Sequence, residues 1–312
     1  MRHAFSVIFL TTLIGAGQGL FLALYCVEIG ALFGLTGPVP SAFFAGGGVL
    51  SVALLVAGLA ASFFHLGHPE RAWRSAAMWR TSWLSREVIV LPAFIASVLV
   101  YGVAHYQAAG ASAWIGAIAA LLCMALFVCT GMIYACLKFL QEWHTPLTPI
   151  NFFLLGAASG LMLAAAFAAF TATPLIAPLG VAAVIATVLA LVMRVAALAR
   201  NARIRPKSSL QTAIGVKHPR IEQKSQGLMG GAFNTREFFH GRGIRLVRAV
   251  KWIFLLLTFP LPVVLAVIGI GLELPSLLAP AFGVQYLGLL AERWYFFVQA
   301  RHPQNLYYQV IS

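Results

Sequence analysis

Long apolar runs alternate with short polar segments along this chain. Each run has about the 20 residues that an α-helix needs to cross a bilayer, and none shows the alternating ten-residue segments of a membrane β-barrel. We count eight runs: residues 5–34, 42–66, 87–107, 111–136, 148–171, 174–198, 247–271 and 274–299. The pattern predicts an all-α polytopic membrane protein. Its eight transmembrane helices would form one integral membrane domain over 1–312.

Composition supports the same conclusion, since 61% of the residues are hydrophobic and the mean hydropathy is +0.90. Such values lie outside the range of soluble domains. The first run follows Arg2 but is too long for a secretion signal, so we expect a membrane helix there. Its segment Gly15-Ala16-Gly17-Gln18-Gly19 favours close helix packing over nucleotide binding.

The basic residues predict the topology. All 21 Lys and Arg fall on one side of the eight runs, in or beside residues 1–4, 67–86, 137–147, 199–246 and the tail after 299. The opposite loops contain none: 35–41, 108–110, 172–173 and 272–273. By the positive-inside rule, both termini and the long loop are cytoplasmic. The net charge of +13 then reflects orientation and contact with anionic lipid, rather than nucleic-acid binding.

The segment 199–246 is longer than orientation requires. It contains the cations Arg203 and Arg205, and further along it places Phe side chains among basic residues. Exposed Phe beside Arg is typical of a protein-docking surface, although these rings would also suit the lipid interface. The candidate docking residues are Arg74, Arg203, Arg205, Phe233, Arg236, Phe238 and Phe239.

Titratable groups concentrate between the second and third runs. Six charged residues and two histidines fall within 24 residues, with His65 ending one run and Glu87 beginning the next. Adjacent antiparallel helices would bring His65 and Glu87 to the same membrane edge. There an imidazole and a carboxylate could exchange protons with a lipid-soluble quinone. Arg71, Arg74 and Arg86 could keep Glu87 ionised or stabilise the charge of the semiquinone. Equally, the segment is a lipid-facing hinge whose charges only set orientation.

Other ionisable residues give weaker signals. Glu28 lies in the outer half of the first run, where it either belongs to a proton path with Gln18 or sits at the interface. The eight histidines fall at run ends or in loops, so no haem and no metal are expected in this chain. The four cysteines lack CxxC spacing, which argues against an iron–sulfur cluster here.

The polar segment also resembles a known family, that of the membrane-anchor subunits of dimethyl sulfoxide reductase-type enzymes (DmsC). The resemblance rests on length, eight runs and the pattern His65-Leu66-Gly67-x-Pro69-x-Arg71-Ala72 followed by Ser85-x-Glu87. It implies that the chain binds an iron–sulfur subunit and a molybdopterin catalytic subunit, which carry those cofactors. It also implies a location in the bacterial inner (cytoplasmic) membrane and a site for ubiquinone or menaquinone. The predicted quinone-binding residues are His65, Glu87, Arg71, Ser85, Arg86 and Trp83.

The basic loop is similar to that of the family branch that anchors cytoplasmic sulfite-oxidising complexes of the SoeABC type. This likeness implies a sulfite:quinone oxidoreductase in which the present chain performs no sulfite chemistry and passes electrons to quinone. The residues suit the reverse flow equally, so a quinol-oxidising anchor of a dimethyl sulfoxide, polysulfide or other oxyanion reductase stays open. A secondary transporter is disfavoured, because the sequence shows no convincing internal repeat.

Overall fold

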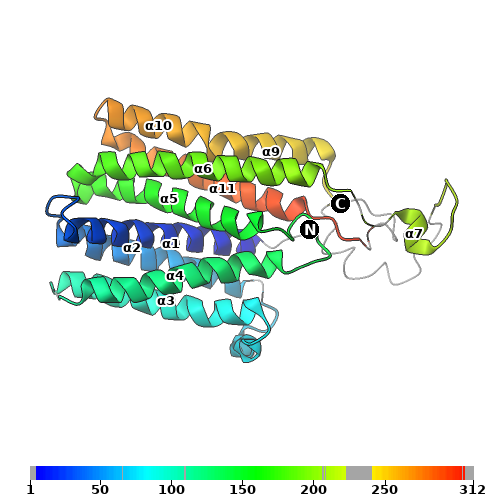
Figure 1. Ribbon diagram of the computed structural model, residues 1–312, viewed down its shortest axis with the longest axis horizontal. Helices are drawn as coiled ribbons and strands as arrows, with labels where there is room; N and C mark the ends of the chain where they lie inside the picture. The colour runs from blue at the N-terminus through cyan, green and yellow to red at the C-terminus, as the bar shows by residue number, and fades with distance from the viewer. Residues whose placement is uncertain are drawn as a thin grey trace.

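The chain folds into a bundle of long helices that lie side by side in a computed structural model (Figure 1). The structure describes residues 5–64, 66–108, 110–205, 207, 209–222, 241–303 and 305, in which every regular element is helical. The α-helices are α1 Phe5–Leu32, α2 Ser41–Phe63, α3 Trp83–Tyr106, α4 Ser112–Ala135, α5 Leu147–Thr171, α6 Ile176–Ala202, α7 Leu210–Ile214, α9 Ile244–Thr258, α10 Pro260–Gly271 and α11 Leu278–Val298. Short 3₁₀ helices are η1 Pro69–Met78, η2 Thr173–Leu175 and η3 Pro275–Leu277.

Within the described residues, seven helical segments are long and apolar enough to cross a membrane. They are α1 to α5, η2 with α6 (Thr173–Ala202), and α9 with α10 (Ile244–Gly271). Helix α11 is not among them, because Gln285, Glu292 and Arg293 lower its hydropathy. It nevertheless packs along α9, α5 and α10 in the bundle. The all-α membrane architecture is thus confirmed, while the eighth span stays a prediction.

Several helix boundaries differ from the predicted spans by up to four residues, and two of the differences have a clear local cause. Helix α3 begins at Trp83 rather than at residue 87, because the Ser82 hydroxyl caps it by accepting from the Ser85 N–H at 3.3 Å. The run 247–271 is two helices, α9 and α10, that meet at Phe259. Pro260 has no N–H to continue the hydrogen bonding of α9, so the chain bends there.

Helix α1 occupies the middle of the bundle and contacts α2, α4, α5 and α11. The backbones of α1 and α5 approach each other closely where the two helices cross, because glycines of both helices lie at the crossing. A Cβ added at Gly19 would lie 2.0 Å from the carbonyl oxygen of Gly156. Small residues allow helices in a membrane to approach this closely. The prediction that the glycine-rich segment of α1 serves helix packing is therefore confirmed.

Gly19→Ala is expected to destabilise the protein by about 1–3 kcal/mol, because the new methyl group forces α1 and α5 apart. Gly15→Ala is the matched control on the same helix, since its Cβ would meet only Gly156 Cα at an ordinary 3.6 Å. Thermal unfolding in detergent measures both. Equal melting temperatures for the two variants would contradict the close crossing.

Helix α1 begins and helix α11 ends at the same end of the bundle, where η1 and α7 also lie (Figure 1). We call this the loop end. Here η1 exposes Trp73 and Met78, and the adjoining Trp79 is exposed as well. Five residues predicted from the sequence lie outside the described residues: His65, Phe233, Arg236, Phe238 and Phe239.

Candidate functional site

A buried carboxylate lies near the loop end of the bundle. Glu87 is in the second turn of α3, about 6 Å along the helix from its first residue. Glu87 is only 8% exposed, and its Oε1 accepts a hydrogen bond from the hydroxyl of Thr130 on α4. A carboxyl group is rarely buried in a membrane protein without a role, because burial of its charge is expensive.

Glu87 lines a small cavity between α1, α3, α4 and α5. The volume is about 20 Å³, and the lining consists of Leu10, Thr11, Ile14, Gly15, Gln18, Glu87, Phe127, Thr130 and Phe152. That space suits one water molecule, which the polar groups of Glu87, Thr130 and Gln18 would bind. It is too small for a quinone ring. The structure thus brings together Glu87 and Gln18, which the sequence suggested for separate roles.

Gln18 is itself fixed across the bundle. Its side-chain amide donates to the carbonyl oxygen of Cys123 on α4 at 3.0 Å, and the residue is buried. Because the donor is held by α4, the orientation of the amide at the cavity is set by helix packing. Gln18 therefore presents a fixed dipole next to Glu87.

Arg86 and Trp83 lie in the first turn of α3 and do not line this cavity. The Arg86 guanidinium lies 4.3 Å from the centre of the Trp83 ring, a cation–π distance. The same guanidinium donates to the carbonyl oxygens of Trp79 at 2.9 Å and Arg80 at 2.8 Å. These contacts fix the connection between η1 and α3. Ser85, by contrast, is buried.

The remaining predicted cations of the segment are exposed. Arg71 lies 3.7 Å from the Glu70 carboxylate, and Arg74 lies over the Trp73 ring at 5.5 Å. Such exposed pairs contribute little to stability. Since their described partners belong to η1 itself, both guanidinium groups remain accessible at the loop end. Arg203 and Arg205, which follow α6, are exposed too.

Glu28 lies at the opposite end of the bundle and does not share the Glu87 cavity. It is 6% exposed, and Oε1 accepts from the Ser112 hydroxyl at 2.6 Å. His105 Nε2 lies 3.1 Å from the same oxygen. The imidazole is stacked on Phe44, with ring centres 4.3 Å apart. Glu28 is thus part of a buried polar cluster joining α1, α3 and α4.

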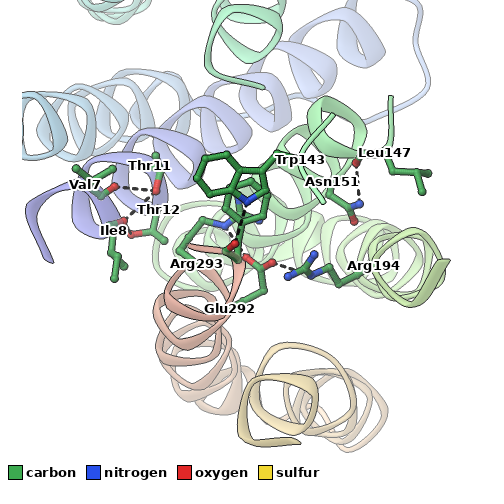
Figure 2. A network of polar contacts seen from close by, with 11 residues as sticks. Val7, Ile8, Thr11, Thr12, Trp143, Leu147, Asn151, Arg194, Glu292 and Arg293 are labelled. Carbon is green, nitrogen blue, oxygen red and sulfur yellow. Dashed lines mark hydrogen bonds and ion pairs between the residues drawn. The ribbon is translucent and has the colours of Figure 1, made fainter. Parts of the chain in front are cut away.

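Sequence reasoning missed a second buried charge cluster. Arg194 on α6 pairs with Glu292 on α11 at 2.7 Å, and the neighbouring Arg293 bonds the other oxygen of that carboxylate (Figure 2). From the sequence, Arg194 and Arg293 count only among the cations that set orientation. The adjacent opposite charges of Glu292 and Arg293 inside an apolar run were the available signal, because ionisable groups within membrane helices usually have a function.

Comparisons of the sequence with known proteins show the family to which this chain belongs. Residues 1–218 match the family model described as DMSO reductase anchor subunit (DmsC). This match includes α1 to α7, and with them Glu28, Glu87 and Arg194. Over its full length the chain is also 54% identical to a sulfite dehydrogenase subunit from Allochromatium vinosum, with 100% of each chain covered. This alignment therefore also includes the residues of α9 to α11, which lie beyond the family match.

Proposed function

The chain belongs to the DMSO reductase anchor subunit (DmsC) family, and from this premise we propose that it anchors a molybdoenzyme complex to the membrane and exchanges electrons with quinone. An iron–sulfur subunit and a molybdopterin subunit would dock at the loop end. That end carries the exposed cations Arg71, Arg74, Arg203 and Arg205 together with the exposed ring of Trp73. Arg and Trp are enriched in protein interfaces, which supports docking here.

The loop end would face the cytoplasm, and eight helices would cross the bacterial inner membrane. Every Lys and Arg of the described residues lies on the loop-end side, whereas the connections at the opposite end, residues 33–40, 107–111, 172–175 and 272–277, have none in the sequence. By the positive-inside rule, this distribution supports the proposed orientation. Helix α11 counts as the eighth span because its polar side chains face the interior, where Gln285, Glu292 and Arg293 are buried.

The observation that carries the quinone proposal is the buried carboxyl group of Glu87 beside a water-sized cavity. A bound quinone accepts two electrons and two protons when it is reduced. The donor set of Glu87, Thr130 and Gln18 fits proton supply to such a carrier, because a carboxyl group exchanges protons and the hydroxyl and amide fix its position. The ring itself would bind outside the cavity, towards the lipid.

Thr130 supports the carboxyl group of Glu87 in one orientation. A proton held on Glu87 is then close to the loop end, and the water-sized space beside it provides a route of exchange. His65, which follows α2 in the sequence, would act with Glu87 as the second proton-exchanging group.

Sulfite is the substrate we propose for the partner subunits, because the 54% identical relative is named as part of a sulfite dehydrogenase. Electrons from sulfite would then pass through the iron–sulfur subunit to quinone. The family description as a DMSO reductase anchor favours quinol oxidation as the second candidate. Glu87 serves either direction, since proton uptake and release use the same group.

Affinity purification of the tagged chain from its native membranes tests the anchor role. We expect stoichiometric molybdenum and iron–sulfur protein in the eluate, and reduction of a quinone analogue when sulfite is added. A chain that purifies alone under mild detergent would contradict the proposal. A complex that reduces quinone but does not oxidise sulfite would contradict only the proposed substrate.

Because Glu87 lies at the loop end, protons and electrons would reach quinone from the same side, and turnover would move no net charge. Proteoliposomes containing the complex and quinone, supplied with sulfite on the loop side, are expected to develop no membrane potential. A voltage-sensitive dye measures this, with a terminal oxidase as the positive control. A potential generated without the oxidase would contradict proton uptake at the loop end.

A further inference from the structure

The charge cluster of α6 and α11 is buried and has an excess of positive charge. Arg194, Glu292 and Arg293 are 2%, 0% and 4% exposed, respectively. Two guanidinium groups share one carboxylate, as Figure 2 shows. Both cations also lie over aromatic rings, Arg293 at 4.0 Å from the centre of Phe152 and Arg194 at 5.5 Å from that of Phe254. The cluster therefore carries a net charge of +1 away from bulk water.

The carboxylate of Glu142, which lines the adjoining cavity, does not neutralise this charge. Its Oε2 accepts from the Arg301 N–H at 3.5 Å, and the cations that act on it are Arg301 and Arg200. Burial raises the pKa of Glu142, and the nearby Arg301 and Arg200 compensate its charge. An unpaired buried charge is costly, so the cluster requires a counter-ion.

Unpartnered hydrogen-bond donors of the cluster surround a small cavity. Its volume is about 10 Å³, and it is lined by Glu142, Thr145, Thr148, Asn151, Phe152, Arg194, Ala197, Asn201, Arg293, Phe296 and Gln299. Arg194 Nη2, Arg293 Nη1 and Gln299 Nε2 are buried and find no acceptor among the described residues. Three free donors in one lining are unusual, because buried polar groups are almost always hydrogen-bonded.

Arg194 Nε and Glu292 Oε1, which also lack a hydrogen bond, face each other in the 2.7 Å ion pair. The remaining acceptor of the lining without a partner among the described residues is Asn151 Oδ1. Exchanging the oxygen and nitrogen of this amide does not remove the imbalance. Asn151 Nδ2 donates to the Leu147 and Met193 carbonyl oxygens at 2.7 and 3.3 Å, so the nitrogen must stay where it is. Three donors against one acceptor, together with a net positive charge, describe an environment that favours an anion over water.

We propose that this cavity binds one small monovalent anion of the size of chloride, held by Arg194, Arg293 and Gln299. The small volume excludes phosphate or sulfate. The anion neutralises the cluster and bridges α6 to α11 beside the loop end. Its binding stabilises the packing of these helices by mass action, as for any ligand of the native state.

Thermal unfolding of the detergent-purified full-length protein in chloride against gluconate, at constant ionic strength, tests this site. We expect the melting temperature to rise by about 5 °C between about 1 and 100 mM chloride for a dissociation constant near 1 mM. Bromide should act like chloride. A rise with sulfate but not with chloride, or no dependence on halide, would overturn the proposal.

Three variants separate anion binding from a purely structural ion pair. Arg293→Gln leaves a neutral Arg194–Glu292 pair and should abolish the chloride dependence. Glu292→Gln raises the charge of the cluster to +2 and should enlarge the dependence, even if the variant is less stable. Lys138→Gln is the control, since this cation is exposed at the loop end and does not line the cavity. The same chloride dependence in all three would overturn the proposal.

Discussion

Glu87→Gln is expected to lower quinone reduction by about 10²-fold or more, the usual contribution of a positioned proton donor. The amide has the shape of the carboxyl group and still accepts from Thr130, but it exchanges no proton. Electron delivery to a soluble dye should be unchanged, because the partner subunits and their docking are unaffected. Sulfite-dependent reduction of a quinone analogue and of the dye, measured on one preparation, checks this.

Three companion variants show whether the effect belongs to the Glu87 site. Thr130→Val removes the hydrogen bond to the carboxyl group and should shift the pH profile of quinone reduction while leaving dye reduction intact. His65→Ala should resemble Glu87→Gln. Glu70→Gln is the matched control, because this carboxylate is exposed on η1. If quinone reduction persists in Glu87→Gln, the quinone site lies elsewhere.

His105→Leu is expected to destabilise the protein by about 3–5 kcal/mol, since it leaves the Glu28 carboxylate buried without its imidazole partner. The double variant Glu28→Gln/His105→Leu should recover much of this loss, because no unpaired charge then remains. Thermal unfolding of wild type, both single variants and the double variant gives the coupling free energy.

The same variants address the proton path suggested by the sequence for Glu28 and Gln18. Glu28→Gln should leave quinone reduction unchanged, since the cavity next to Glu87 includes Gln18 but not Glu28. Gln18→Leu, which removes a polar group from that cavity, should slow quinone reduction. A strong loss of quinone activity in Glu28→Gln at full stability would instead support a path through the far end of the bundle.

Hydrophobic patterning predicted the helices well because a membrane helix satisfies its own backbone hydrogen bonds and needs only apolar length. The same rule failed where a single side chain determines where a helix begins or breaks. It placed the start of α3 four residues late, since the capping hydroxyl of Ser82 compensates for the polar residues that follow it. It also missed the break at Pro260, because proline does not interrupt an apolar run.

The candidate site was predicted only in part. Glu87 stood out because a carboxylate at the start of an apolar run is conspicuous, whereas its partner Thr130 is 43 residues away and chemically ordinary. Gln18 was identified without its neighbour. Arg194 and Glu292, which lie on different helices far apart in the sequence, were not linked at all, because nothing in a sequence shows which faces of two helices meet.

By itself, the sequence determined that the chain is a helical membrane protein, and by its distribution of charge it predicts which end faces the cytoplasm. Both properties depend on sums over many residues, namely transfer free energy and net charge. Only the tertiary structure decided which buried groups meet: Glu87 with Thr130, and two arginines around one glutamate. Such pairs depend on helix rotation and depth, which the close packing of side chains fixes and hydropathy does not record.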